Sequence, residues 1–170
     1  MNDKDFDFEA LEPQIVGAGI LPISMINDDF EILLGKERYI NHWRGSLKWS
    51  GFEGGRKETE SIIDTACREF IEESLEAVSI NHYDFSLERK YHQEIRNIIE
   101  EKKYFMRIIL CINHENENVK RYHVTYVIEV PYSILYVQNF VEKRKKIVDL
   151  FHKLSQFQKL QEQIDNTYPF

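Results

Sequence analysis

The strongest constraint on the fold is an amphipathic segment that follows directly after a pair of glycines. Apolar residues recur at spacings of three and four over residues 61–73, which predicts a helix with one apolar face. These residues are Ile62, Ile63, Ala66 and Phe70. Such a face is buried against another layer, and β-rich segments occur both before and after it, so a mixed α/β fold is expected.

The same helix carries three glutamates that lie close together on its surface. Because each helical residue turns by ~100°, Glu69, Glu72 and Glu73 fall within one narrow arc. Like charges at this spacing repel each other and disfavour the helix by roughly a few tenths of a kcal/mol per pair. A hard divalent cation such as Mg²⁺ reverses this sign, because it takes oxygen ligands. The preceding glycines allow backbone carbonyls and amides to approach a metal ion or a phosphate.

This segment resembles the signature of the Nudix hydrolases, which reads G-x5-E-x7-R-E-U-x-E-E-x-G-U, where U is a bulky apolar residue. The matching residues, at unbroken spacing, are Gly54, Glu60, Arg68, Glu69, Phe70, Glu72 and Glu73. With this chain's composition, a chance match has a probability on the order of 10⁻⁴. Gly54 is taken as the glycine of this box, because Gly55 would need a one-residue deletion. Leu75 and Glu76 replace the last glycine and the last apolar residue, a departure that concerns the exit from the helix.

The resemblance covers about residues 14–135 and implies a Nudix-like α/β/α sandwich with a mixed β-sheet. It also implies a pyrophosphohydrolase dependent on Mg²⁺ or Mn²⁺, in which water attacks a phosphorus atom of a diphosphate linkage. Arg68 would orient a box carboxylate through a charge-assisted hydrogen bond, and Glu60 would tie the loop to the helix. The implied metal ligands are Glu69, Glu73, Glu72 and the backbone carbonyl of Gly54.

Two further segments are expected to flank this domain. Residues 1–13 are predicted to form an acidic tail, and residues 136–170 a C-terminal helix that packs on the domain or extends from it. Within the domain, the turn signal Asn27-Asp28-Asp29 predicts a hairpin. Alternating and β-branched residues predict strands over residues 104–112 and 122–130.

Aromatic and charged residues near the box are candidates for substrate binding. Trp49 and Phe52 could stack on a base, although core packing is the commoner role of such residues, and Arg56 follows the glycine pair. Glu129 is either a general base facing the metals or, more commonly for such a residue, an edge-strand charge facing water. The basic run 143–146 could hold RNA backbone or a polyphosphate, although a solvated helix turn is the commoner explanation.

Together these residues favour a phosphoanhydride substrate that contains a nucleotide, with capped RNA as the more specific hypothesis and RNA as a partner. The alternative is a catalytically silent Nudix module that binds a nucleotide or a protein partner. Loss of box acids would favour that alternative, and all four box glutamates are present.

Composition restricts the remaining possibilities. The 170 residues fit one domain, and the formal net charge of −7 argues against a surface devoted to nucleic acid while permitting one local basic site. No apolar run approaches the ~18 residues that span a bilayer, and the acidic start does not resemble a signal sequence. The two cysteines are distant in sequence. A cytoplasmic protein with no membrane partner is therefore expected.

Overall fold

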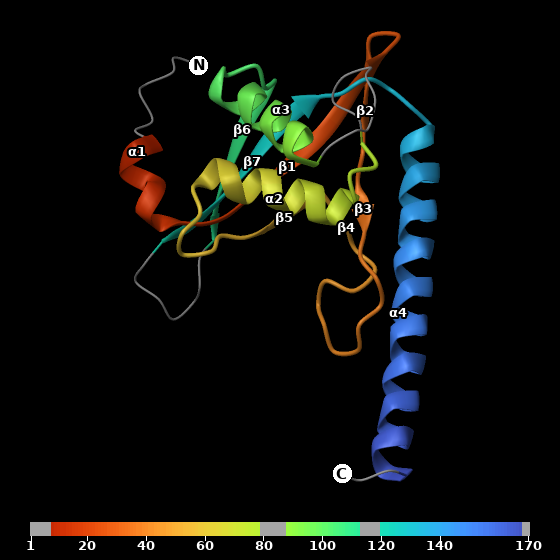
Figure 1. Cartoon of the computed structure of the whole chain (residues 1–170). Coiled ribbons are helices and arrows are strands. Elements are labelled where there is room, and N and C mark those ends of the chain that lie inside the picture. The colour runs from red at the N-terminus through yellow and green to blue at the C-terminus, as the bar shows by residue number, and fades with distance from the viewer. Residues whose placement is uncertain (1–7, 79–87, 113–119, 168–170) are drawn as a thin grey trace, which may run out of the picture. The chain divides into compact units, whose positions relative to one another are not determined.

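The computed structural model describes residues 8–78, 88–112 and 120–167 of the chain. The chain divides into two compact units, Met1–Tyr132 and Ser133–Phe170. The first unit contains the sheet and the helices that pack on it, and the second contains one long helix (Figure 1). The boundary lies close to the limit expected at residue 135.

A five-stranded mixed sheet forms the centre of the first unit, and the long strand β1 (Ile15–Ile26) is its axis (Figure 1). On one side, β1 pairs in parallel with β7 (Arg121–Glu129), which pairs antiparallel with β6 (Met106–Ile112). On the other side, β1 pairs antiparallel with β5 (Phe52–Gly55) along its first half and with β2 (Asp29–Ile32) along its second. The mixed sheet with its packed helices confirms the predicted α/β fold class.

A tight turn joins β1 to β2 at the place that the sequence predicts. Asn27 and Asp28 both have positive φ angles, of 51° and 69°. Asparagine and aspartate tolerate this left-handed conformation better than most residues, so they are common in two-residue hairpin turns. Ile26 and Asp29 close the hairpin as a register pair, and the predicted hairpin is confirmed.

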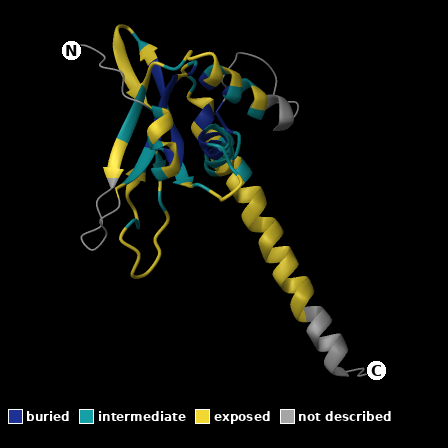
Figure 2. Ribbon diagram, turned by 90° about the vertical axis from the view of Figure 1, so that its left-hand side faces the viewer, coloured by how far each residue is buried: buried dark blue, intermediate teal, exposed yellow. Residues whose placement is uncertain are grey.

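Helix α2 (Ile62–Ser74) packs on β1 and β5 and buries the apolar face that its residue spacing predicts (Figure 2). The Ser61 hydroxyl caps the helix by accepting a hydrogen bond of 3.0 Å from the Asp64 backbone amide. The helix ends at Leu75, which adopts a left-handed conformation with a φ of 52°. The Nudix signature has glycine at this position, the residue that adopts the conformation with least strain. The departure at Leu75 therefore concerns the helix end, as expected.

Helix α3 (Glu88–Glu100) packs on α2 and is not among the elements predicted from the sequence. Ile95 and Ile99 are its buried apolar residues. Arg96 of α3 donates hydrogen bonds to the carboxylate of Asp64 on α2 and, at 2.7 Å, to that of Glu100. Apolar burial and ion pairs together brace the first turns of α2 from its outer side.

The segment before β1 is helical and attached to the rest of the unit. It contains α1 (Phe8–Leu11) and the 3₁₀ turn η1 (Glu12–Gln14). The guanidinium of Arg107 lies 3.8 Å from the ring centroid of Phe8, and Arg56 donates a 3.1 Å hydrogen bond to the η1 carbonyl of Glu12. The described part of the expected tail is therefore anchored, while residues 1–7 lie outside the described residues.

A separate two-stranded ribbon lies just before β5 in the chain. It pairs β3 (Gly35–Lys36) with β4 (Trp49–Ser50), and the loop of residues 37–48 extends from it (Figure 1). Only Gly51 separates β4 from β5. The ribbon therefore leads directly into the box glycines.

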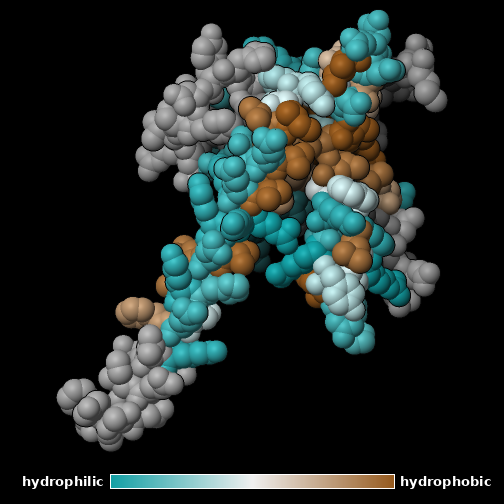
Figure 3. Space-filling model, turned by 90° about the vertical axis from the view of Figure 1, so that its right-hand side faces the viewer, coloured by the Kyte–Doolittle hydropathy of each residue, from teal (hydrophilic) through white to brown (hydrophobic). Residues whose placement is uncertain are grey.

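The second unit is helix α4 (Leu135–Thr167), close to the helix predicted over residues 136–170. It includes the basic run 143–146, and large apolar side chains such as Val141 and Phe151 are exposed among its charged residues (Figure 3). Among the described residues, none of the helices combines the length and the apolarity needed to span a bilayer.

Candidate active site

The centre of the box is the guanidinium of Arg68, whose five N–H groups all donate hydrogen bonds. Its Nε and Nη2 bind the two carboxylate oxygens of Glu60 at 2.6 and 2.9 Å. Its Nη1 donates to Glu69 at 2.6 Å and to Glu72 at 3.2 Å, and its Nη2 also donates to the carbonyl of Gly55 at 2.9 Å. With its side chain only 17% exposed, Arg68 thus joins the helix, the glycine turn and three box carboxylates.

Glu60 holds the loop before α2 in place. Besides Arg68, its carboxylate accepts hydrogen bonds of 3.2 Å from the Lys57 backbone amide and from the Thr65 hydroxyl. The hydrogen bonds from Arg68 lower the pKa of Glu60 to about 2, outweighing the effect of its burial. Glu60 is therefore ionised across the neutral range and available as a fixed partner for Arg68, in the position expected from the Nudix resemblance.

Gly54 is the point of closest approach between the glycine turn and α2. A Cβ atom added at Gly54 would overlap the carboxylate of Glu69, whereas one added at Gly55 would meet nothing within 4 Å. On its other side Gly54 pairs with Ala18 of β1. The steric requirement for glycine therefore falls on Gly54, the residue assigned to the box from its spacing.

Gly54→Ala is expected to lower the free energy of unfolding by about 1 kcal/mol, because the added methyl group must displace the Glu69 carboxylate and with it the 2.6 Å hydrogen bond from Arg68 Nη1. Gly55→Ala is the matched control and should change it by less than about 0.5 kcal/mol, because its Cβ lies in open space. Urea denaturation of both variants measures the difference. Equal losses would show that the close approach at Gly54 has no energetic consequence.

Glu73 is a box carboxylate whose pKa is raised, in contrast to that of Glu60. Burial, reinforced by the negative charges of Glu69, Glu37 and Glu53, raises the pKa of Glu73 to about 7. One hydrogen bond opposes this rise, since the backbone amide of Glu53 donates to Glu73 Oε2 at 2.8 Å. Glu73 is therefore a partly buried carboxyl group with other carboxylates close by.

Gly17 and Gly19 of β1 leave space for the side chain of Glu53 to cross the sheet. Glu53 was not among the site residues predicted from the sequence. A Cβ at Gly19 would overlap Glu53, and one at Gly17 would lie 2.6 Å from the His123 ring. The Glu53 carboxylate thus reaches β7, where Oε2 accepts a 3.0 Å hydrogen bond from the Thr125 hydroxyl and lies 3.6 Å from His123 Nδ1. The available signal was the spacing of the glycines, because residues two apart in a strand face the same side.

The candidate substrate-binding residues differ in whether their side chains are free to contact a substrate. Phe52 is 6% exposed and packs edge-to-face on Phe70 with ring centroids 5.4 Å apart, so its assignment to a substrate is corrected to a core role. Arg56 is engaged structurally: its Nε donates to the Glu60 carbonyl at 2.8 Å, and its other nitrogens bond to Glu12. Trp49 is 63% exposed on β4 and remains available for binding.

Glu129 is exposed near the end of β7, where it pairs with Ile23 of β1. Because β7 lies between β1 and β6, the expectation of an edge strand is wrong. Four residues separate Glu129 from Thr125, which corresponds to roughly 13 Å along a strand. The structure therefore does not bring Glu129 to the Glu53 carboxylate.

The donor chemistry of this site fits Mg²⁺ or Mn²⁺, since it consists of the α2 carboxylates and the Gly54 carbonyl. Within residues 8–78, 88–112 and 120–167, no three His, Cys, Asp or Glu side chains already converge as a metal-binding group. The oxygens of Glu69 and Glu72 instead face Arg68. Two observations nevertheless fit a cation: the carboxylate pressed onto Gly54, and the raised pKa of Glu73 among like charges.

Comparisons with known proteins give matches among solved structures alone. No protein-family model matches the chain, and no curated protein sequence matches it. It is similar to an Ap4A hydrolase of C. elegans solved as a binary complex, with a TM-score of 0.41 and 14% identity over 69% of this chain and 68% of that one. It is also similar to the Nudix hydrolase RenU of M. smegmatis, with a TM-score of 0.44 and 10% identity over 71% of this chain and 63% of that one. A third similar structure is the NUDIX domain of Shewanella oneidensis NrtR complexed with ADP ribose, with a TM-score of 0.40 and 14% identity over 78% and 73% of the two chains. Solved structures similar to this chain thus include a Nudix hydrolase and a NUDIX domain.

Proposed function

We propose that this protein is a Nudix-type hydrolase that uses Mg²⁺ or Mn²⁺ to cleave a diphosphate linkage in a substrate containing a nucleotide. The observation that carries the proposal is the crowding of carboxylates at the glycine turn. Glu69 is pressed onto Gly54, and Glu73 has its pKa raised to about 7. A divalent cation bound there would attract the carboxylates that otherwise repel each other, and would so stabilise the arrangement.

Glu69, Glu73 and Glu72, with the Gly54 carbonyl, are the residues that would hold the cation. Once bound, it would supply neutralisation of phosphate oxygens and a water molecule of lowered pKa. The protein's own contribution is to position these ligands. Arg68 holds Glu69 and Glu72 on one face of α2, and the Glu53 amide directs Glu73.

A cation bound at this site would require a local exchange of hydrogen-bond partners. Arg68 Nη1 now occupies oxygens of both Glu69 and Glu72, while its Nε and Nη2 remain on Glu60. The Glu60 carboxylate, whose pKa is lowered to about 2, would keep Arg68 anchored if the other two carboxylates turned toward a cation. Glu60 and Arg68 are therefore positioning residues in this proposal.

The cation requirement is tested by thermal unfolding. Added Mg²⁺ should raise the melting temperature of the native protein, because it binds the folded carboxylate cluster and not the unfolded chain. The variant Glu69→Gln/Glu73→Gln should lose this response. Glu31→Gln/Glu142→Gln, at two exposed glutamates, makes the same charge change and should retain it. Equal shifts in all three proteins would mean that Mg²⁺ binds elsewhere.

Within this class of substrates, a more specific candidate can be named. Capped RNA is the specific candidate suggested by the basic run 143–146 on α4. If capped RNA is the substrate, it should be cleaved faster than the free cap nucleotide. Neutralising residues 143–146 should also reduce the salt dependence of RNA binding. Without those results, a small nucleotide remains the proposed substrate.

A further inference from the structure

The ribbon β3–β4 and its loop, residues 36–49, carry an unusual share of the exposed aromatic surface. We call this segment the cationic hairpin. It contains both tryptophans of the chain. Trp43 is 45% exposed, Trp49 63% and Tyr39 68%, although aromatic residues usually dominate a core. Three exposed aromatic rings on one short hairpin indicate a surface that contacts a ligand.

The charge of the same hairpin opposes that of the chain. It contains four cations and one anion, while the chain has a formal net charge of −7. The cations are Lys36, Arg38, Arg44 and Lys48, and the anion is Glu37. A flat aromatic surface surrounded by positive charge is complementary to a ligand with a ring system and negative groups.

The loop of the cationic hairpin is ordered by its own hydrogen bonds. Ser46 Oγ accepts from the Ile40 backbone amide at 2.8 Å and donates to the Ile40 carbonyl at 2.5 Å. The Trp43 amide donates to the Ile40 carbonyl at 3.2 Å, and Lys36 Nζ lies 5.3 Å from the centroid of the Trp49 ring. The backbone of the loop is thus ordered before a ligand binds, which lowers the entropy lost on binding.

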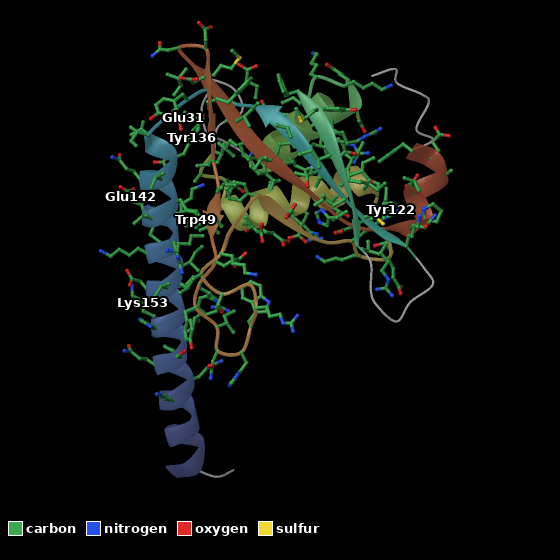
Figure 4. All side chains as sticks on the ribbon, turned by 180° about the vertical axis from the view of Figure 1, so that it is seen from behind. Glu31, Trp49, Tyr122, Tyr136, Glu142 and Lys153 are labelled. Carbon is green, nitrogen blue, oxygen red and sulfur yellow. The ribbon has the colours of Figure 1, made fainter. Side chains whose placement is uncertain are left out.

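The base of the cationic hairpin lies next to the proposed cation site. Only Gly51 separates β4 from β5, which carries Glu53 and Gly54, and the Glu53 amide donates a 2.8 Å hydrogen bond to Glu73. Trp49 precedes Gly54 by five residues, at most ~17 Å along the extended chain. It lies on β4, the strand that follows the loop of residues 37–48 (Figure 4). One extended nucleotide can therefore reach both places.

We propose that the cationic hairpin binds the nucleotide part of the substrate, with the base stacked on the ring of Trp49 and the phosphates neutralised by the neighbouring lysines and arginines. Lys36 lies over the Trp49 ring and can pair with a phosphate of the stacked nucleotide. The ligand class is a nucleoside di- or polyphosphate, whose phosphate chain continues to Gly54 and Glu73. This inference rests on the proposed function and specifies which part of the chain selects the nucleotide.

Intrinsic fluorescence tests the assignment directly, because a Trp43→Phe variant leaves Trp49 as the only tryptophan in the chain. The probe is α,β-methylene-ADP, which cannot be cleaved at the bridge between its phosphorus atoms. Its addition with Mg²⁺ should quench the Trp49 emission, and inorganic triphosphate should not. Absence of quenching at a nucleotide concentration that saturates calorimetric binding would overturn the assignment. So would quenching by oligouridylate or phosphatidylserine vesicles but not by the nucleotide.

Hydrolysis separates this inference from the proposed function. Trp49→Ala should lower kcat/KM for a nucleotide substrate by about tenfold or more, mostly through KM, and leave cleavage of inorganic triphosphate unchanged. Tyr132→Ala, at another exposed aromatic residue of the first unit, should change neither. Equal losses on both substrates would show a structural effect and contradict the inference. If quenching occurs but no phosphoanhydride is cleaved by the native protein, the proposed function fails while the nucleotide site stands.

Discussion

Glu73→Gln is expected to lower kcat by about a thousandfold or more while the protein stays folded. The reason is that charge stabilisation by a bound cation supplies several kcal/mol to phosphoryl transfer, and each 1.4 kcal/mol is about tenfold in rate. Gln retains an oxygen that can accept the 2.8 Å hydrogen bond from the Glu53 amide. The loss should therefore appear in kcat measured at saturating Mg²⁺ and substrate.

The same substitution should stabilise the metal-free protein at alkaline pH. The pKa of Glu73 is about 7 in the folded chain, against an ordinary value of 4.5 for this side chain. A carboxyl whose pKa is raised by folding favours the folded state while it is protonated, so its contribution is complete below pH 4.5 and is lost as the pH rises through 7. Glu73→Gln removes this titration. Its melting temperature in EDTA should exceed that of the native protein at pH 8 and approach it at pH 5.

Two results would contradict this account of Glu73. Unchanged turnover of the variant at matched metal concentration would remove Glu73 from the reaction. A melting difference that is the same at pH 5 and pH 8 would show that its acidity is not perturbed. Glu72→Gln is the informative comparison, because the Glu72 side chain is 56% exposed and should give the smaller change in stability.

Arg68→Ala should have the largest effect on folding, lowering the free energy of unfolding by about 3 kcal/mol. Its side chain and that of Glu60 are only 17% and 16% exposed, so the substitution leaves largely buried carboxylates without their cation. The pKa of Glu60, now about 2, should rise because its largest cause is the hydrogen bonding from Arg68. Denaturant titration and NMR titration of the Glu60 carboxyl measure the two effects.

Arg96→Ala is the matched control for Arg68→Ala. Arg96 also bonds two carboxylates, those of Asp64 and Glu100. The side chains of Arg96 and its two partners are 31–44% exposed, so the free energy of unfolding should fall by about 1 kcal/mol or less. Arg68→Lys keeps the charge but not the planar fork of five donors, and should recover only part of the stability. Equal destabilisation by Arg68→Ala and Arg96→Ala would contradict the central role of Arg68.

The parts that the sequence could predict are those in which local spacing determines geometry. The helix over residues 61–73, the turn at Asn27 and Asp28 and the two later strands each follow from periodicity or turn chemistry within a short window. Likewise, the shared face of Glu69, Glu72 and Glu73 follows from helical geometry. The glycine pair predicted a close approach of the backbone to a metal ion or a phosphate, and the structure shows in addition the close approach of Gly54 to Glu69.

The parts that could not be predicted depend on contacts between distant segments. Phe52 borders the box in sequence, but in the structure it pairs with Ile20 of β1 and contacts Phe70. These contacts place its side chain in the core. Glu53 reaches Thr125 and His123 only because β1 brings Gly19 between them. No single-sequence pattern specifies this three-strand register, because each strand alone is compatible with several partners.

The most direct test of the proposed function is hydrolysis in oxygen-18 water of a panel of phosphoanhydrides, with products identified by mass. The panel contains nucleoside diphosphate sugars, nucleoside triphosphates, dinucleoside polyphosphates, diphosphoinositol polyphosphates and capped RNA. The account predicts that a nucleotide member is cleaved only with Mg²⁺ or Mn²⁺, that one product phosphate carries a single oxygen-18 atom, and that Glu69→Gln/Glu73→Gln is inactive. If the folded native protein binds metal and nucleotide but leaves every member intact, it is a silent binding module and the proposed hydrolase activity is contradicted.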